Sequence, residues 1–501
     1  MRTMQTVLIV CLVFALSVVA VAQTTNGTGG GNWSAAATWA GGVVPTGAGT
    51  ITIASTDSVI FDVPVIITGT LVNQSTRPST VGSASSLTVA NGGTYQHAAN
   101  GGPIPTATWA TGSTCLVTGA TSSAPSNANQ NFYNFTWNCP GQTGGLNVGW
   151  NGNTIGGNLN VLGTGAIGNG FRMSSNTYGQ VATAPNIITI NGNVNVSGVS
   201  YLTATGSGTP THYIRVIVNG NLNCADAVSA FQLANGSGCF GSWWVKGNVI
   251  FAFAPTTNNT NPDTLVFCGT GVQTLTNTSE LTNFNIVISP GAQVAMGSSS
   301  TMGTTGAKSF TMANGATFIC GSASGLIGNI SLTSGTVTFG TACNFVFNGS
   351  VAQVTSTLMP ATVYNVTVNN ATGVTSSQSL TITNALYNLS GTLSGPYTAA
   401  KTSTDVQENF SGMPRVFALN QNYPNPFNPT TQISYNIPKE SYVSLKVYNL
   451  IGQEVATLVS GNQIAGMHDV SFDASHLSSG VYMYRLQAGT SVDVKRMLLL
   501  K

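Results

Sequence analysis

The chain has 501 residues and a formal net charge of +2, and only 5% of its residues are charged. Typical soluble domains are about one quarter charged, yet 42% of this chain is hydrophobic, which is enough to build a core. Disordered chains combine low hydrophobicity with high charge, so this composition argues against disorder. The near-neutral balance provides no electrostatic footprint for nucleic acid or for an anionic membrane surface, and no nucleic acid is expected among the partners.

Residues 1–22 have the pattern of a secretory signal peptide. Arg2 provides a short positive region, Val7 to Val21 form an apolar run, and Ala20-Val21-Ala22 is a small-x-small cleavage signal. We therefore expect secretion and a mature chain that begins near Gln23. No other stretch reaches the roughly 20 apolar residues that a membrane span needs.

The cysteines predict disulfides, because an exported chain enters an oxidising space. Of the eight cysteines, Cys11 lies in the signal peptide, which leaves seven. Pairing of sequence neighbours would leave Cys268 free, although spacing alone leaves the connectivity open. The pairs would be Cys115 with Cys139, Cys224 with Cys239, and Cys320 with Cys343. Alternatively, the cysteines remain unpaired and are buried as small hydrophobic side chains. No Cys or His spacing indicates a metal site, and no cofactor is expected.

Charge divides the mature chain into two parts. Ten charged residues lie between Gln23 and Ala400, whereas fifteen lie between Lys401 and Lys501. A stretch with Ser, Thr, Gly and Pro joins the two parts. We predict a passenger body at 23–394, a linker at 395–414 and a C-terminal domain at 415–501.

Short β-branched runs punctuated by Gly and Asn fill the body. Examples are Thr50–Ile53, Val59–Val63, Ile187–Ile190, Tyr213–Val218 and Val363–Val368. Runs of this kind between turn residues predict strands, and no amphipathic helix pattern of useful length appears. Asn-Gly-Asn turns recur at 191–193 and 219–221, with Gly247-Asn248 as a partial copy. Asn and Gly accept the left-handed backbone conformations that tight corners require.

The body also contains an internal repeat with an offset of 80 residues. Phe267-Cys268-Gly269-Thr270 with Gln273 matches Phe347-Asn348-Gly349-Ser350 with Gln353, and residues 284–288 match 364–368; residues 118–137 hold a fainter copy. Repeated strand-and-corner units that cannot bury their faces alone must stack on neighbours. The predicted fold class is therefore all-β, with a right-handed parallel β-helix or solenoid as the passenger. A string of sandwich domains is the alternative.

The start of the body has motifs of its own. Gly31-Asn32-Trp33-Ser34, Thr38-Trp39 and Gly41-Gly42, followed by strands, resemble the opening of bacterial surface β-helix proteins. The acidic residue that usually precedes the first strand of those proteins is absent, since Gly49 and Thr50 occupy that stretch. Trp33 and Trp39 are expected to cap the first coil, as terminal repeats require.

The last ninety residues carry an ordered series of motifs. They begin near Leu419, continue through alternating strands at 431–437 and 443–450, and end with a run from Lys495 to Lys501. The motif residues are Asn422, Tyr423, Pro424, Asn425, Pro426, Phe427, Asn428, Pro429, Gly452, Gly480, Lys495 and Lys501. Along its whole length this series resembles the type A C-terminal sorting domain of the type IX secretion system. The prolines keep the start extended, and about seven short strands in about 85 residues fit an immunoglobulin-like sandwich.

The resemblance implies how the protein travels. Sorting domains of this family are read by an outer-membrane translocon and are typically cut off by a sortase-like peptidase. The passenger is then joined to an anionic lipopolysaccharide or released. The expected partners are therefore the translocon, the peptidase and anionic lipopolysaccharide, the cut is expected in the linker, and the expected location is the surface or surroundings of a Gram-negative bacterium.

Catalysis by the body would need carboxyl groups that converge. Glycoside hydrolysis generally uses two carboxyl groups about 5–10 Å apart. Asp57 and Asp62 would lie on opposite faces of a regular strand, whereas Asp226 and Asp263 could meet on adjacent coils. The remaining candidates for acid, base or lyase chemistry are Glu280, Arg215, Lys246, His97 and His212. Isolated charges in such a body more often form turns, so the body is not expected to be an enzyme.

Trp243 and Trp244 are the candidate ligand-binding residues, because exposed aromatic rings stack on sugar faces. Neighbours in a strand point to opposite faces, so at most one of the two rings is exposed and the other is core. We predict an exported β-solenoid that acts as an adhesin or structural surface component. The alternatives are a carbohydrate-active β-helix enzyme, either a polysaccharide lyase or a glycosidase, and a self-assembling extracellular matrix or filament subunit. Glycans and further copies of the chain complete the expected partners.

Overall fold

The structure is a computed structural model. It describes residues 22–166, 168, 170–174, 185–205, 212–224, 230–234, 239–252, 263–277, 284–298, 300, 304–330, 332–403, 417–422, 424–438, 441–463 and 466–500. The predicted signal peptide up to residue 21, most of the predicted linker, Tyr423 and Lys501 lie outside this part. Within it, no helix combines the length and the apolar character needed to cross a bilayer.

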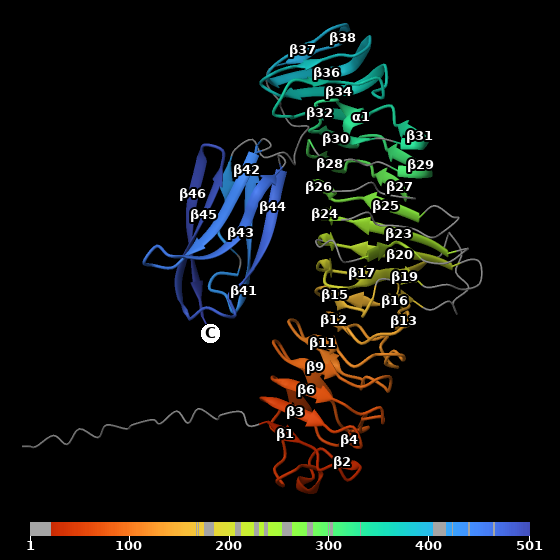
Figure 1. The fold of residues 1–501 in the computed structure, drawn as a ribbon, viewed down its shortest axis with the longest axis vertical. Coiled ribbons are helices and arrows are strands. Elements are labelled where there is room, and N and C mark those ends of the chain that lie inside the picture. The colour runs from red at the N-terminus through yellow and green to blue at the C-terminus, as the bar shows by residue number, and fades with distance from the viewer. Residues whose placement is uncertain are drawn as a thin grey trace, which may run out of the picture.

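The body is a β-solenoid whose strands pair in parallel from one coil to the next, as predicted (Figure 1). One 18-stranded sheet runs along its whole described length. In stacking order its strands are β1 (Gln23–Thr24), β3 (Thr50–Ile53), β6 (Thr70–Asn73), β9 (Thr94–His97), β11 (Thr114–Val117), β12 (Asn134–Asn138), β15 (Leu159–Gly163), β18 (Val194–Val196), β21 (Leu222–Cys224), β24 (Val249–Phe251), β26 (Val272–Asn277), β28 (Gln293–Met296), β30 (Thr317–Cys320), β32 (Asn344–Phe347), β34 (Thr362–Asn369) and β36 (Leu380–Ser390). The last two strands, β38 (Tyr397–Ala399) and β39 (Thr402–Ser403), both pair with β36.

A second sheet of eight parallel strands forms another side of the solenoid. Its strands are β14 (Thr154–Ile155), β17 (Asn186–Ile190), β20 (His212–Val218), β23 (Cys239–Val245), β25 (Asp263–Phe267), β27 (Phe284–Ile288), β29 (Thr304–Met312) and β31 (Leu332–Phe339). The smaller sheets contain β2 (Gly30–Asn32), β4 (Ser58–Phe61) and β7 (Thr80–Val81); β5 (Val65–Ile67), β8 (Leu87–Val89) and β10 (Thr108–Trp109); β13 (Leu146–Asn147), β16 (Phe171–Ser174), β19 (Tyr201–Thr205) and β22 (Ala230–Gln232); and β33 (Gln353–Val354), β35 (Val374–Thr375) and β37 (Leu393–Ser394). Two short helices, η1 (Ala36–Thr38) and α1 (Leu326–Asn329), complete the body.

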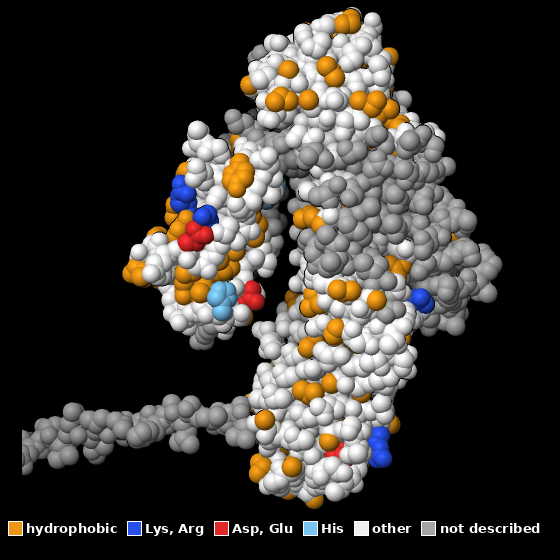
Figure 2. All heavy atoms as spheres, viewed as in Figure 1, with side chains coloured by type: hydrophobic (Ala, Val, Ile, Leu, Met, Phe, Trp, Pro, Cys, Tyr) orange, Lys and Arg blue, Asp and Glu red, His pale blue; other side chains and the backbone are white. Residues whose placement is uncertain are grey.

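Inward-pointing side chains stack into apolar columns along the solenoid axis. In one column, Val216 pairs with Trp243, which pairs with Leu265, and Ile286 and Phe310 follow in the next coils. All five side chains are buried. Each such side chain contributes about 1.5–3 kcal/mol through burial. The outward positions carry mainly uncharged polar groups, and Figure 2 shows few charged side chains on the described surface of the body. Hydroxyl and amide groups thus cover the outside of a body that has little charge.

One corner of the solenoid is held by a ladder of asparagines. The Oδ1 of Asn134, Asn158, Asn193 and Asn221 each accepts the backbone N–H of the ladder residue in the next coil, the last of which is Asn248. The N···O distances are 2.7–2.9 Å. At each corner a backbone N–H group lies outside the strand-to-strand hydrogen bonds of the sheets. The asparagine side chain of the preceding coil accepts a hydrogen bond from it, so this donor is paired.

The glycines of the recurring Asn-Gly-Asn turns have a steric role. A Cβ on Gly192, Gly220 or Gly247 would overlap the ladder asparagine of the preceding coil, and at Gly220 it would also lie 2.6 Å from the carbonyl oxygen of Gly192. None of the three has a positive φ. The sequence-based explanation, a left-handed backbone, is therefore wrong for these corners. Glycine is required because successive coils approach each other closely there.

The ladder makes a specific prediction about stability. Asn193→Ala removes the acceptor of the Asn221 N–H, so we expect the free energy of unfolding to fall by about 1–3 kcal/mol. Asn219→Ala is the matched control, because the Asn219 side chain bonds to Asn191 at the exposed surface; its effect should stay within about 0.5 kcal/mol. Urea unfolding of the two full-length variants measures both values. Equal losses would show that the ladder hydrogen bond does not stabilise the corner.

The 80-residue repeat gives two coils the same pattern of hydrogen bonds around a glutamine side chain. Gln273 accepts the N–H of Gly269 at 2.7 Å and donates to two carbonyl oxygens of the preceding coil. Gln353 accepts the N–H of Gly349 at 2.8 Å and donates in the same way. The repeated strands, however, lie in different sheets: residues 284–288 form β27 of the eight-stranded sheet, and 364–368 belong to β34 of the long sheet. The offset of 80 residues therefore does not carry a strand back to the same side of the solenoid.

One boundary and two cysteine pairings predicted from the sequence need correction. β38 and β39 pair in parallel with β36, so the solenoid continues to Ser403, beyond the predicted end at 394. Cys115, Cys139, Cys320 and Cys343 are free thiols in the structure. Their strand register explains why. Cys115 lies opposite Phe135, four positions before Cys139, and Cys320 lies opposite Phe347, four positions after Cys343.

Four strand positions span about 13 Å at about 3.3 Å each, whereas a disulfide needs Cα atoms within about 7 Å. The pairings Cys115–Cys139 and Cys320–Cys343 are therefore not formed. Burial raises the pKa of the Cys139 and Cys320 thiols to about 12. This agrees with the alternative that these cysteines are small buried side chains. The pair Cys224–Cys239 stays a prediction, because the side chain of Cys239 lies outside the described residues.

The C-terminal domain consists of two antiparallel sheets beside the solenoid (Figure 1). One sheet contains β40 (Ala418–Leu419), β41 (Thr430–Ile437) and β44 (Gly466–Asp473). The other contains β43 (Glu454–Gln463), β42 (Ser441–Tyr448), β45 (Gly480–Ala488) and β46 (Ser491–Leu499). Their inner faces share one core that includes Tyr435, Val447 and Leu486. The predicted strand number is thus present, while the immunoglobulin-like topology stays a prediction.

Candidate functional site

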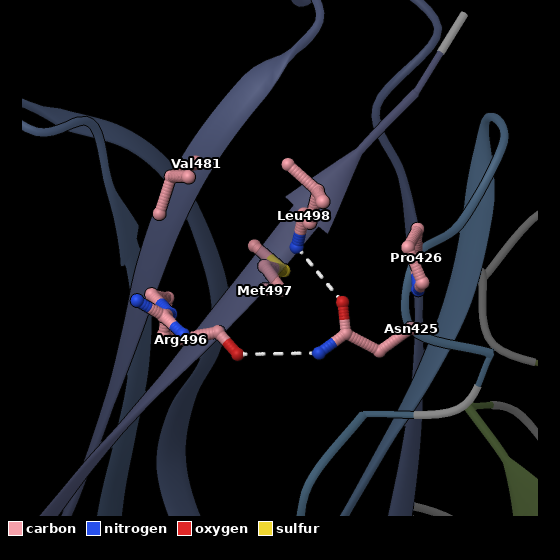
Figure 3. Close-up of a pocket in the computed structure, with 6 residues that line it drawn as sticks. All are labelled: Asn425, Pro426, Val481, Arg496, Met497 and Leu498. Carbon is pink, nitrogen blue, oxygen red and sulfur yellow. Dashed lines mark hydrogen bonds between the residues drawn. The ribbon is translucent and has the colours of Figure 1, made fainter.

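After β40, the described residues 420–422 and 424–429 form an opening segment, part of which lies along the outer edge of the last strand, β46. Asn425 uses its side-chain amide as a strand partner: Oδ1 accepts the N–H of Leu498 at 2.9 Å, and Nδ2 donates to the carbonyl of Arg496 at 3.5 Å (Figure 3). Phe427 then exchanges two backbone hydrogen bonds of 3.0 Å with Leu498 and Leu500. The opening segment therefore covers part of an edge that would otherwise be available for pairing with other chains.

Buried anchors hold the opening segment in place. The hydroxyl of Tyr484 donates to the carbonyl of Asn420 and accepts the N–H of Asn422, both at 2.8 Å. Burial raises the pKa of Tyr484 to about 12, so the hydroxyl stays protonated and can do both. The side chain of Asn422 donates to Thr431, and Phe427 is buried against the core with Phe472 nearby.

The remaining motif residues separate into turn formers and exposed positions. Gly452 has a φ of +81° in the turn between β42 and β43, and Gly480 begins β45 opposite Leu499. Lys495 lies 3.7 Å from Asp493 on the same strand. The exposed or half-exposed motif positions are Pro424, Asn425, Pro426, Asn428 and Pro429. Asn425 and Pro426 also border a cavity of about 340 Å³ with Val481, Arg496, Met497 and Leu498 (Figure 3).

Trp243 and Trp244 on β23 point to opposite faces of the strand, as the alternation of a strand predicts. Trp243 is fully buried, packs edge-on against Phe231, and donates to the carbonyl of Leu233 at 3.1 Å. Trp243 is thus a core residue and cannot contact a ligand, which corrects its place among the candidates. Trp244 points outward, and the guanidinium of Arg215 lies over its ring at 4.8 Å from the centroid.

Trp244 belongs to a group of outward residues on neighbouring strands. Tyr213 of β20 and Phe240 of β23 are in register and stack with centroids 4.5 Å apart and ring planes 5° apart. We call Tyr213, Arg215, Phe240 and Trp244 the aromatic face. A cavity of about 190 Å³ opens beside it, lined by Pro185, Tyr213, Ile214, Arg215, Phe240, Gly241, Ser242 and Thr264. Aromatic rings, a guanidinium and the hydroxyl-bearing residues Tyr213, Ser242 and Thr264 therefore meet at one hollow of the outer surface.

Two donors of the aromatic face have no acceptor. The Nε of Arg215 and the Nε1 of Trp244 are both buried, and neither has a hydrogen-bond partner within the described part of the chain. Buried donors are nearly always paired in native proteins. Both nitrogen atoms are shielded from solvent, so they could donate to a ligand oxygen only after the side chains that cover them move.

Trp244 and Arg215 were predicted from the sequence as candidate site residues, whereas Tyr213 and Phe240 were not. A usable signal was present, because Gly220 and Gly247 are separated by 27 residues, and so are Tyr213 and Phe240. Applying the 27-residue spacing of these corner glycines to the strands before them would have predicted that the rings of Tyr213 and Phe240 stack.

The described carboxylates of the body accept hydrogen bonds from backbone N–H groups. Asp57 accepts the N–H groups of Gly27 and Gly29 at 2.8 and 2.7 Å. Asp62 accepts the N–H and the hydroxyl of Ser34. Asp263 is buried and accepts two further N–H groups. Asp226 and Glu280 lie outside the described residues, so their predicted roles stay untested.

The two histidines of the body are not brought together. His97 is buried in the core, where Nε2 donates to the carbonyl of Gly101 at 2.8 Å and Nδ1 faces the Tyr95 hydroxyl at 3.3 Å. Burial lowers the pKa of His97, so the ring is neutral. The side chain of His212 lies outside the described residues. Among the residues that are described, no group of three potential metal ligands occurs.

Asp57 should make the first coils sensitive to acid. Burial raises the pKa of its carboxyl group, but hydrogen bonds from Thr25, Gly29 and Gly27 outweigh that effect, and the pKa lies below the ordinary 3.8. A lowered folded-state pKa gives stability that is present above pH 3.8 and is lost as the pH falls through the folded value. Thermal unfolding between pH 5 and pH 2.5 should therefore show a steeper loss for the wild type than for Asp57→Asn. Parallel profiles would contradict this assignment.

Residues 421–500 match the family model of the secretion system C-terminal sorting domain. The match begins within the opening segment and ends after the last strand of the two-sheet domain. No curated protein and no solved structure matches the chain. The protein therefore carries, behind a β-solenoid passenger, the C-terminal sorting domain of the type IX (Por) secretion system, which directs it to the cell surface or out of the cell.

Proposed function

We propose that the solenoid acts outside the cell as an adhesin, and that its aromatic face binds glycans that carry acidic groups. The observation that supports this most strongly is a hollow of the outer surface lined by two stacked aromatic rings, hydroxyl groups and Arg215, with two buried donors of Arg215 and Trp244 that have no partner in the described residues. Sugars combine apolar C–H faces with many oxygen acceptors, and an acidic sugar adds a charge that a guanidinium binds strongly.

A binding role is favoured over catalysis by the use of the carboxylates. Asp57, Asp62 and Asp263 each accept two hydrogen bonds from groups of the preceding coil, and Asp263 lies far along the solenoid from the other two. A carboxylate committed to backbone N–H groups is a poor general acid, because those bonds favour its ionised form. We therefore propose that the passenger is not an enzyme.

The filament alternative is weakened by the N-terminal end of the solenoid. Residues 38–40 run antiparallel to β1 and cover its edge: Ala40 donates to Thr24, and Asn26 donates to Thr38. Trp39 and Trp33 close the coil below, with ring centroids 4.9 Å apart. An edge that is already paired cannot template a further copy of the chain.

We also propose that a sortase-like peptidase removes the sorting domain, and that the passenger is then joined to anionic lipopolysaccharide or released. The cut would lie after Ser403, where the last solenoid strand ends, and before Phe417, where the described part of the sorting domain begins. The N-terminal and C-terminal residues of the released passenger, determined by mass spectrometry, would test this boundary.

The proposed glycan binding can be tested with the purified mature chain. It is incubated with insoluble polysaccharides, some neutral and some with carboxyl or sulfate groups, and the pelleted fraction is recorded at low and high salt. We expect selective pelleting with acidic polymers, weaker at high salt because the charge interaction is screened. No pelleting on any polymer would contradict the proposal, and polymers seen by sedimentation velocity would then favour the self-associating structural role.

A further inference from the structure

The turn between β42 and β43 exposes two adjacent apolar side chains. Leu450 is 68% exposed and Ile451 is 78% exposed, the highest values among the large hydrophobic side chains of the described residues. We call these two residues the tip. Single exposed hydrophobic residues are common on protein surfaces, whereas these two are neighbours and protrude together from one turn.

The tip is held rigidly. The Oδ1 of Asn449 accepts the N–H groups of Ile451 and Gln453 at 3.2 and 3.0 Å, and its Nδ2 donates to the Gln453 side chain at 2.9 Å. The N–H of Gly452 bonds to the Asn449 carbonyl at 3.0 Å, and its φ of +81° suits glycine. Two apolar groups on a pre-ordered turn lose little entropy when they bind.

The solenoid leaves the tip accessible. The far end of the same hairpin faces the passenger: Val459 and Gln463 line a cavity of about 580 Å³ together with Asn223 and Thr274. The turn lies at the beginning of β43 and Gln463 at its end, so the strand separates the two by about 30 Å at about 3.3 Å per residue. The sorting domain can therefore contact its passenger and a second protein at the same time.

We propose that the tip inserts into an apolar pocket on a protein of the secretion machinery that reads the sorting domain. The partner is assigned from the position of the tip inside the matched residues 421–500, from its separation from the passenger, and from its apolar chemistry. The inference rests on the sorting function and is independent of the proposed glycan binding.

The test compares two double variants of the full chain in cells that possess the secretion machinery. Leu450→Ser with Ile451→Ser changes the tip. Val492→Thr with Val494→Thr is the matched control, because both valines are 46% exposed on β46 of the same domain. The fraction of protein outside the cell is measured, and thermal unfolding of the purified variants reports whether the domain remains folded. We expect at least a tenfold lower secreted fraction for the tip variant and wild-type secretion for the control.

A tip variant that is secreted like the wild type would overturn the proposal, as would equal losses in both variants. If the serine variant unfolds, Ile451→Lys replaces it, since a side chain that is 78% exposed tolerates a charge without disturbing the core. Membrane insertion is the competing explanation. Binding of the full chain to protein-free lipid vesicles that depends on the tip would overturn insertion into a protein pocket.

Discussion

Trp243→Ala should lower the free energy of unfolding of the solenoid by about 3–5 kcal/mol, the usual cost of truncating a large aromatic side chain in a core. The side chain is fully buried, stands in an apolar column between Val216 and Leu265, and supplies the hydrogen bond to Leu233. Its neighbour is a natural control. Trp244→Ala removes an outward ring and its contact with Arg215, which is worth about 0.5–1 kcal/mol.

Urea unfolding of the two full-length variants measures the difference between the inner and outer tryptophan. A coil-by-coil array can lose one region before the others, so the far-ultraviolet signal should show an early transition for Trp243→Ala. Comparable losses for both variants would mean that Trp244 is also a core residue, and the aromatic face would then not be available to a ligand.

Phe427→Ala should unfold the sorting domain and keep the protein inside the cell. Phe427 is 2% exposed, joins the core beside Phe472, and carries the two backbone bonds that fasten the opening segment to β46. Loss of its ring should cost about 3–5 kcal/mol, a large part of the 5–15 kcal/mol that stabilises a typical domain. Asn428→Ala changes the next motif residue, which is exposed.

Comparison of Phe427→Ala with Asn428→Ala separates the effect of unfolding the domain from the effect of losing an exposed motif side chain. Protease resistance of the C-terminal domain and the secreted fraction are measured for both variants. We expect both quantities to fall for Phe427→Ala, and protease resistance to stay unchanged for Asn428→Ala. Normal secretion of a chain whose sorting domain is protease-sensitive would contradict the view that the folded opening segment is required for export.

Periodic patterns made the fold predictable from sequence. Alternation at Thr50–Ile53 follows from local geometry, since a strand repeats every two residues. The Asn-Gly-Asn triplets marked the corners correctly, but the reason for them is the close approach of successive coils. The same alternation gave the division of Trp243 and Trp244. The ladder itself was not foreseen, because the partner of each asparagine lies in the next coil, and coil length varies from 24 residues between Asn134 and Asn158 to 35 between Asn158 and Asn193.

The missed features depend on register between coils. Cys115 and Cys139 look like partners in the sequence, but the register places Cys115 opposite Phe135. Tyr213 and Phe240 look unrelated, although the register stacks them. The end of the solenoid at Ser403 depends on the pairing of β38 and β39 with β36, which composition does not reveal. The sorting domain was recognised from the order and spacing of its motif residues, although several of its strand pairings, such as β41 with β44 and β42 with β45, join residues far apart in the sequence.

The most direct test of the account is glycan binding by the full-length variant Arg215→Gln with Trp244→Phe. This change removes the two unpaired donors and keeps most of the volume of both side chains. On the polysaccharide that pellets the wild type, we expect the variant to have a dissociation constant at least tenfold higher and an unchanged unfolding transition. Equal affinity of the variant and the wild type would contradict it, and would place the binding surface of the passenger elsewhere on the solenoid.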